Sequence, residues 1–324
     1  MKAVQLTEFG GPEVLKMVDL EKPMPGPSEV LIDIKAIGVN YADTARREGQ
    51  YVVKTELPFV PGAEIAGKVA AVGDNVQTVS VGSRVVTLIE SRGYAEFAVA
   101  NERSLIPIPD GVDYKLAVAL PLQGLSAYHI IKTMGRLEKG ESILIHAAAG
   151  GVGTLAVQLA KLFGAGKVIA TASNDEKLAL AKEMGADGLV NYTEEGWEDQ
   201  VLALTDGKGV DVALEMAGGE VFSKTLACLA PFGRLVIYGV ASGVQSRLYP
   251  SSLMAKNQSV IGFFLPQIMR KSDLFRSSLQ ELLTYVSNGQ LKLTIGGEFP
   301  LDEAAAVHRL LQGRKTTGKL VLVP

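Results

Sequence analysis

The stretch LIHAAAGGVGTLAVQLA, residues 144–160, contains no charged side chain, although 21% of the 324 residues in the chain are charged. The uncharged run begins at residue 142, and a run of this length can cross a membrane as one helix. Three glycines within four positions, Gly150, Gly151 and Gly153, are unfavourable in such a helix. The run therefore predicts buried elements of a globular fold, and we expect no membrane span.

The glycines lie between a predicted strand, SILIHA (142–147), and a predicted amphipathic helix, TLAVQLAKLFG (154–164). A strand-to-helix junction of this kind binds pyrophosphate in dinucleotide-binding folds, because backbone N–H groups and the positive end of the helix dipole face the anion. Aligned to G-x-G-x-x-G, the junction reads Ala148-Ala149-Gly150-Gly151-Val152-Gly153, with alanine at the first glycine. In this alignment Gly150 lets the backbone approach the phosphates, and Gly153 lets the helix pack closely on the strand. We predict a dinucleotide site at residues 149–153; a glycine turn without a ligand is the alternative.

The segments that follow repeat the alternation of strand and helix. Further strands are predicted at 167–172, 188–192, 210–216, 234–240 and 259–265, with helical periodicity in most of the intervals. Six strands joined mostly by helices predict an α/β fold with a doubly wound parallel sheet.

The segments at both ends of the chain have a different pattern. Nine of the fourteen prolines lie in the first 121 residues, between short alternating runs such as EVLIDIKAIGV (29–39), which predicts an all-β unit. Two amphipathic helices and a final strand, GKLVLVP (318–324), end the chain. If that strand returns to the β-rich unit, the first domain is discontinuous.

Composition narrows the class of ligand. A net charge of −3 provides no strongly basic character for coating nucleic acid or an anionic membrane, so a small-molecule ligand is expected. The single cysteine, Cys228, cannot form an internal disulfide, and the N-terminal residues lack a signal-peptide pattern. We expect a cytoplasmic protein.

The end of the second strand of the parallel sheet distinguishes NAD from NADP. NAD-binding proteins usually carry an acidic residue there, whereas this chain has Ser173, followed by Lys177 one turn later. The small hydroxyl leaves room for a 2′-phosphate and the lysine supplies positive charge, which favours NADP(H). The alternative is a helix capping box formed by Ser173 and Glu176, with Lys177 in solvent.

Four blocks resemble the zinc-independent quinone oxidoreductase branch of the medium-chain dehydrogenase/reductase superfamily: VNYAD (39–43), PGAEIAGKVAAVG (61–73), AAAGGVG (147–153) and TTGKLVLVP (316–324). The resemblance covers the whole chain. It implies a Rossmann NADP-binding domain (122–265) inserted in a GroES-like β-rich catalytic domain (1–121 and 266–324), and a homodimer paired through the strand at 259–265.

The same comparison predicts that the catalytic zinc is missing. Zinc alcohol dehydrogenases of the superfamily have Cys where this chain has Asn40, and a His-Glu pair where it has Ala63-Glu64. Neither an amide nor a methyl group replaces a thiolate or imidazole as a zinc ligand. The histidines are scattered at 129, 146 and 308, which favours packing or surface roles for them.

Without a metal to polarise a carbonyl, the site suits acceptors that take hydride readily, namely quinones and α,β-unsaturated carbonyls. The resemblance gives Asn40 a hydrogen bond to the cofactor ribose or the substrate oxygen; a turn residue is the alternative. It gives Tyr51 the role of proton donor, as in the related enoyl-thioester reductases, with a packing aromatic as the alternative. Asp43 is expected to be structural.

Further cofactor contacts follow from the resemblance alone. Ser126 is expected near the nicotinamide and Tyr192 near the adenosine phosphate. The remaining residues are Tyr238, Gly239, Ala241 and Ser242 after the fifth strand, Phe263 and Phe264 after the sixth, and Arg314 near the end of the chain.

Three functions stay open. The leading one is an NADPH-dependent, zinc-free quinone or enone reductase. The nearest rival is an enoyl-thioester reductase, which would use the same Asn40 and Tyr51. A third possibility, of another class, is a non-catalytic NADPH-binding or RNA-binding protein of crystallin type. The sequence does not identify the acceptor.

Overall fold

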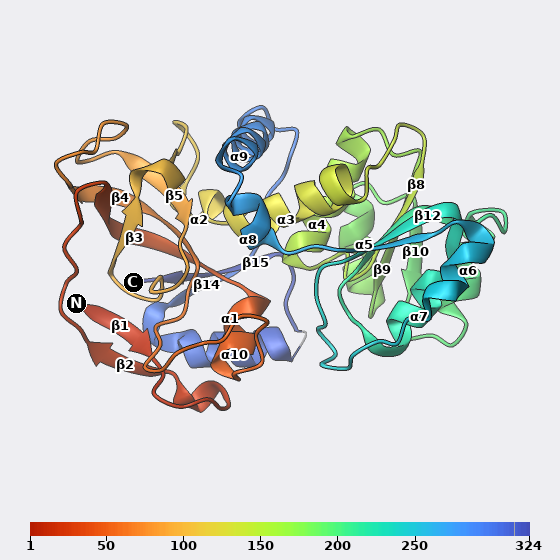
Figure 1. Cartoon of the computed structure of the whole chain (residues 1–324), viewed down its shortest axis with the longest axis horizontal. Helices are drawn as coiled ribbons and strands as arrows, with labels where there is room; N and C mark the ends of the chain where they lie inside the picture. The colour runs from red at the N-terminus through yellow and green to blue at the C-terminus, as the bar shows by residue number, and fades with distance from the viewer. Residues whose placement is uncertain (314) are drawn as a thin grey trace. The chain divides into compact units, whose positions relative to one another are not determined.

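The computed structural model describes residues 1–313 and 315–324 and divides the chain into two compact units (Figure 1). The first unit consists of Met1–Leu122 and Ser272–Pro324, and the second of Gln123–Lys271. The C-terminal strand β15 (Lys319–Val323) pairs antiparallel with β3 (Glu29–Val39), so the end of the chain returns to the sheet of the first unit.

The first unit is built on a mainly antiparallel sheet in the order β14-β15-β3-β4-β5-β7, and β6 also pairs with β3. A separate hairpin joins β1 and β2. Strand β3 runs through its core, since Ile32, Ile34 and Ile37 are all buried. The other strands are β1 (Lys2–Gln5), β2 (Lys16–Asp19), β4 (Glu64–Val72), β5 (Arg84–Leu88), β6 (Phe97–Asn101), β7 (Ile106–Pro107) and β14 (Ile295–Pro300). Its helices are α1 (Tyr41–Arg47), α2 (Tyr114–Ala117), α9 (Ser272–Ser287) and α10 (Ala304–Gln312).

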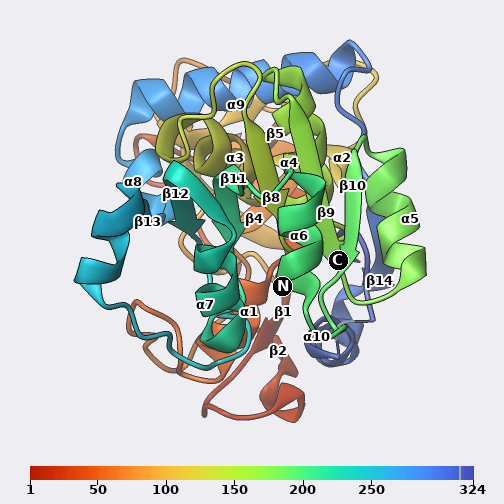
Figure 2. The ribbon, with the colours of Figure 1, turned by 90° about the vertical axis from the view of Figure 1, so that its right-hand side faces the viewer.

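The second unit is a parallel sheet in the order β10-β9-β8-β11-β12-β13 (Figure 2). Its strands are β8 (Ser142–Ile145), β9 (Lys167–Ala172), β10 (Gly188–Asn191), β11 (Val210–Glu215), β12 (Leu229–Ile237) and β13 (Ser259–Gly262). Its helices are α3 (Leu125–His129), α4 (Gly151–Leu162), α5 (Asp175–Glu183), α6 (Trp197–Leu204), α7 (Gly219–Ala227) and α8 (Leu265–Met269). The strand order reverses between β8 and β11, which is the point where doubly wound folds bind ligands. The predicted α/β fold is confirmed.

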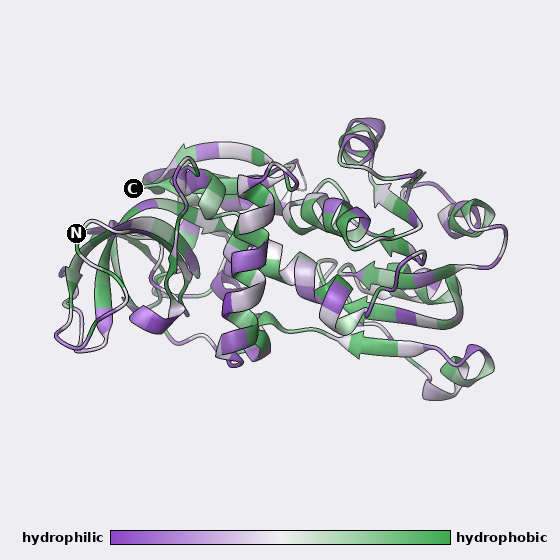
Figure 3. Cartoon of the chain, turned by 90° about the horizontal axis from the view of Figure 1, so that it is seen from above, coloured by the Kyte–Doolittle hydropathy of each residue, from purple (hydrophilic) through white to green (hydrophobic). Residues whose placement is uncertain are grey.

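The uncharged stretch 144–160 is a strand, a turn and a helix, as its glycines predicted. Leu144 and Ile145 end strand β8 in the core, and the strand stops there because Ala147, at φ 50°, starts the turn. The strands of the sheets are mainly hydrophobic in Figure 3, whereas the helices carry hydrophilic bands. Within residues 1–313 and 315–324, no helix has the length and apolar character needed to span a membrane.

Candidate active site

The turn between β8 and α4 presents backbone donors without acceptors. Gly150 N–H donates to the carbonyl of Ala147, at 2.9 Å, and so belongs to the turn. The N–H groups of Gly151, Val152 and Gly153 have no hydrogen-bond acceptor among the described residues. These three donors start a helix of twelve residues, so they and its dipole favour an anion at this end.

The glycines of this turn serve different steric needs. A Cβ on Gly153 would lie 2.2 Å from the Ala147 oxygen and 2.6 Å from the Cα of Ala148, so glycine is needed for the helix to pack on the strand. A Cβ on Gly151 would instead lie 2.1 Å from Oε1 of Gln123. The Gln123 oxygen is buried and has no hydrogen-bond partner in the described part of the chain. The sequence analysis missed Gln123, because its place over the turn depends on the packing of the helical segment before α3.

The other predicted cofactor residues of the second unit mostly follow the carboxyl ends of parallel strands, and therefore share one edge of the sheet. Ser173 follows β9, Tyr192 follows β10, Tyr238, Gly239, Ala241 and Ser242 follow β12, and Phe263 and Phe264 follow β13. Backbone bonds join neighbouring ends: Ala241 N–H donates to Met216 O at 2.8 Å, and Phe263 N–H to Ile237 O at 2.8 Å. Two predicted residues lie elsewhere in the unit, Ser126 in α3 and Lys177 in α5. Arg314 lies outside the described residues.

The alternative capping box at the start of α5 is wrong. Asn174 is the N-cap, and its Oδ1 accepts the backbone N–H of Lys177 at 2.9 Å. Ser173 therefore precedes the cap, because the chain is still extended at Asn174. The Ser173 hydroxyl is not needed to start the helix, which leaves it available to a ligand.

One cavity of the second unit, of about 330 Å³, is lined by Tyr192 and Trp197 together with Glu194, Glu195, Glu220 and Lys224. Its three carboxylates outnumber the one ammonium, which is paired with Glu220, so the lining does not favour a phosphate inside the cavity. Another, of about 140 Å³, is lined by Glu215, whose Oε1 accepts the N–H groups of Ala217 and Gly218. Burial raises the pKa of Glu215, and its buried Oε2 has no partner among the described residues.

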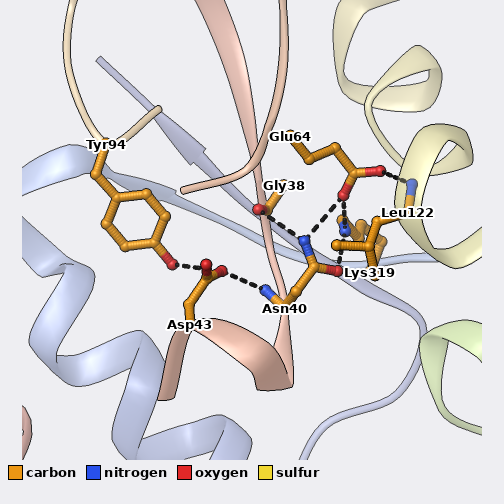
Figure 4. Close-up of polar contacts among 7 residues, drawn as sticks. All are labelled: Gly38, Asn40, Asp43, Glu64, Tyr94, Leu122 and Lys319. Atoms are coloured by element: carbon orange, nitrogen blue, oxygen red, sulfur yellow. Dashed lines mark hydrogen bonds and ion pairs between the residues drawn. The ribbon is translucent and has the colours of Figure 1, made fainter. Parts of the chain in front are cut away.

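The first unit contains a buried network around Glu64 (Figure 4). The ammonium of Lys319 contacts Glu64 Oε2 and donates to Asn40 Oδ1 at 2.8 Å. Glu64 Oε1 accepts the N–H of Leu122, the last residue before the second unit, at 2.6 Å. The side chains of Lys319 and Glu64 are 1% and 0% exposed. A Cβ on Gly38 would lie 2.4 Å from Glu64 Oε2 and 2.8 Å from Lys319 Nζ, so glycine is required beside the pair.

Asn40 is fully engaged inside this network. Its Nδ2 donates to Gly38 O at 3.2 Å and to Glu64 Oε2 at 3.0 Å, which uses both amide protons. Its Oδ1 accepts from Lys319, and its backbone N–H donates to Asp43 Oδ2 at 2.9 Å. The predicted contact of Asn40 with a cofactor or substrate stays a prediction, because partners within the protein already take both amide protons and the lysine occupies Oδ1.

Asp43 belongs to a second chain of hydrogen bonds, which gives its buried carboxylate two donors, the Asn40 N–H and the Tyr94 hydroxyl. Arginine only donates, so Nδ1 of the neutral His308 ring accepts from Arg47 at 3.3 Å, and Nε2 donates to the Tyr94 oxygen at 3.0 Å. Tyr94 O–H then donates to Asp43 Oδ2 at 3.3 Å. Burial lowers the pKa of His308 to about 3, with a further contribution from Arg47. Burial raises the pKa of Asp43 to about 6, against lowering by the Asn40 N–H and the charge of Lys319.

Tyr51 lies in the segment after α1 and is half-buried. The guanidinium of Arg46 stands over its ring, with Cζ 4.6 Å from the centroid.

The matches to known proteins cover both units. Residues 26–110 match the family described as alcohol dehydrogenase GroES-like domain, and residues 151–284 match the zinc-binding dehydrogenase family. Quinone oxidoreductase of Pseudomonas aeruginosa is 38% identical over all of this chain and 99% of its own length. Human quinone oxidoreductase is 35% identical over all of this chain and 98% of its own length. The chain belongs to the quinone oxidoreductase family.

A solved structure carries the same fold throughout. The structure of Escherichia coli quinone oxidoreductase complexed with NADPH is 30% identical and has a TM-score of 0.95, with both chains covered completely. The predicted membership of the quinone oxidoreductase family, within the medium-chain dehydrogenase/reductase superfamily, is therefore confirmed.

In this member of the quinone oxidoreductase family, the sequence analysis missed the lysine at the centre of the Glu64 network. Lys319 lies in the closing motif TTGKLVLVP, from which the sequence alone predicts a strand and no buried ion pair. A charged residue at the start of the apolar strand KLVLV was the available signal, because a buried charge needs a buried partner.

Proposed function

We propose that this quinone oxidoreductase family member is an NADPH-dependent reductase that passes hydride to a quinone or an α,β-unsaturated carbonyl compound. The observation that carries the proposal is the row of N–H groups at Gly151, Val152 and Gly153, which lack acceptors in the described chain and lie at the reversal point of the sheet. The bound NADPH of the E. coli relative supports the choice of cofactor. The dinucleotide supplies the hydride, and the protein orients it and excludes water.

Ser173 and Lys177 support NADPH over NADH, because neither carries a negative charge that would repel a 2′-phosphate. We expect Lys177→Gln to raise the KM for NADPH by about tenfold, the loss of one charge-assisted hydrogen bond. The KM for NADH should change little. The ratio of the KM for NADPH to the KM for NADH therefore measures the contribution of Lys177 at the 2′-phosphate. Lys182→Gln, on the same helix, is the control. An equal rise of both KM values would contradict a role of Lys177 at the 2′-phosphate.

We propose that no catalytic zinc takes part. The chain has Asn40 and Ala63 where the zinc enzymes of the superfamily have two of their ligands. Glu64 is already paired with the Lys319 ammonium, a cation built into the protein. The donor set of amide, methyl and occupied carboxylate does not fit zinc.

The acceptor is tested by oxidation of NADPH in the absence of oxygen, with a panel of quinones, enones and acyl thioesters. Turnover of quinones or enones is expected. Turnover of an enoyl thioester far above both would identify the rival reductase. Tight NADPH binding with no turnover of any acceptor would leave the non-catalytic alternative, and RNA binding that weakens steeply with salt would then support it.

We also propose a cytoplasmic homodimer. Strand β13 ends the parallel sheet, and its outer edge pairs with no strand of the described chain. The preceding segment exposes Val244, Tyr249 and Met254, which are large apolar side chains. Light scattering is expected to give twice the mass of one chain, and the monomer mass would contradict the proposal.

The single cysteine, Cys228, is buried and free, as suits a reducing compartment.

A further inference from the structure

Arg46 and Tyr51 are brought together by the turn at the end of α1. Gly49, at φ 71°, lets the chain reverse, and Gln50 N–H donates back to Ala45 O at 2.9 Å. The Arg46 guanidinium then lies with its Cζ 4.6 Å from the centroid of the Tyr51 ring. The same Cζ lies 5.5 Å from the centroid of the Phe59 ring, so the guanidinium is close to two aromatic rings.

The two consecutive arginines of α1 face different surroundings. Arg47 is fully buried, and its guanidinium is bound to Gly10 O, His308 and Gln312. Arg46 is only half-buried and stacks on Tyr51. Arg47 therefore has a structural role, whereas Arg46 places a positive charge over the ring of Tyr51.

Two charges of α1 act on the Tyr51 hydroxyl in opposite directions. Burial is the largest effect and raises the pKa of Tyr51. The charge of Arg46 and its hydrogen bond lower that pKa, while the negative charge of Asp43 raises it. Arg46 thus opposes the burial that would make the phenol a poor acid.

We propose that Arg46 is a positioning residue that makes the Tyr51 hydroxyl an effective proton donor, by holding a positive charge over the ring in which phenolate charge develops. This inference rests on the proposed function and on the proton-donor role that the family resemblance predicts for Tyr51. The hydride makes an enone into an enolate. The O–H bond of Tyr51 then breaks, the proton goes to the enolate, and the electron pair stays on the phenolate oxygen, which regains a proton from water.

The experiment compares Arg46→Gln with the unaltered protein by ultraviolet titration of the phenolate. Each titration is subtracted from that of the same protein carrying Tyr51→Phe, so that only Tyr51 is observed. We expect its pKa to rise by about one unit in Arg46→Gln. We also expect kcat for an enone to fall by up to about tenfold, the equivalent of one pKa unit, with a larger solvent deuterium isotope effect. Arg46→Lys should recover part of both.

Lys54→Gln is the matched control, since it removes a positive charge from the exposed segment that carries Tyr51. An unchanged Tyr51 titration in Arg46→Gln would overturn the inference. The inference would also be overturned if Arg46→Gln shifted the Tyr51 titration but left kcat and the isotope effect unchanged, while Tyr51→Phe reduced enones slowly. If Tyr51→Phe reduces enones at the full rate, the predicted donor role of Tyr51 fails, and the inference fails with it. The titration distinguishes the two failures, because it shows whether Arg46 changes the pKa of Tyr51 even when Tyr51 donates no proton.

Discussion

Lys319→Met is expected to lower the free energy of unfolding of the first unit by about 3–5 kcal/mol, because it leaves the buried Glu64 carboxylate without its cation. Asn40 Nδ2 and Leu122 N–H would remain as its donors, and neither carries a charge. Denaturant unfolding followed by circular dichroism measures the change. The only tryptophan, Trp197, lies in the second unit, so its fluorescence reports that unit separately.

The matched control is Lys115→Met, which makes the same replacement in an exposed ion pair with Glu298. This variant should unfold close to the unaltered protein, because solvent screens the pair. A double variant, Glu64→Gln with Lys319→Met, should recover much of the loss, since neither of these two positions then carries a buried charge. Equal unfolding midpoints for Lys319→Met and Lys115→Met would refute the account of the network.

Tyr51→Phe is expected to slow the reduction of enones by about 10², the usual contribution of a positioned general acid. Quinones should be reduced at nearly the same rate by both proteins. Hydride transfer to a quinone gives a stabilised hydroquinone anion, and water can protonate its oxygen without help from Tyr51. Steady-state kcat with one enone and one quinone, under identical NADPH, checks this difference.

Tyr114→Phe serves as the control, because it removes the hydroxyl of another half-buried tyrosine of the first unit, over whose ring a guanidinium, that of Arg84, also lies. Equal slowing of quinones and enones by Tyr51→Phe would point instead to a packing role of the ring. Unchanged rates with both would remove Tyr51 from the proton transfer.

Local patterns predicted the second unit well. Hydrophobic periodicity gave its strands and helices, and the glycines after β8 marked the turn with free N–H groups. Such features depend on residues close in sequence, which is why they could be predicted. The alternative reading of Ser173 as the N-cap of α5 was wrong by one residue, because serine and asparagine are equally good N-caps and only the backbone decides between Ser173 and Asn174.

The Glu64 network could not be predicted in the same way. Lys319 is 255 residues from Glu64 and 279 from Asn40, and they meet only because β15 pairs with β3 and β3 with β4. The residue types alone do not predict how β15 and β4 are aligned on β3, and this alignment brings the three side chains together. The resemblance to a family drew attention to Asn40 and Glu64, but as absent or retained zinc ligands rather than as partners of a lysine.

The glycine at position 38 has a consequence for how this protein can change. Its missing side chain leaves the space in which Glu64 and Lys319 meet, and its carbonyl holds Asn40. We therefore expect a larger residue at 38 to be tolerated best with a smaller pair at 64 and 319, and substitutions at these positions to be non-additive. In evolution and in library design, Gly38, Asn40, Glu64 and Lys319 are then expected to behave as one epistatic group.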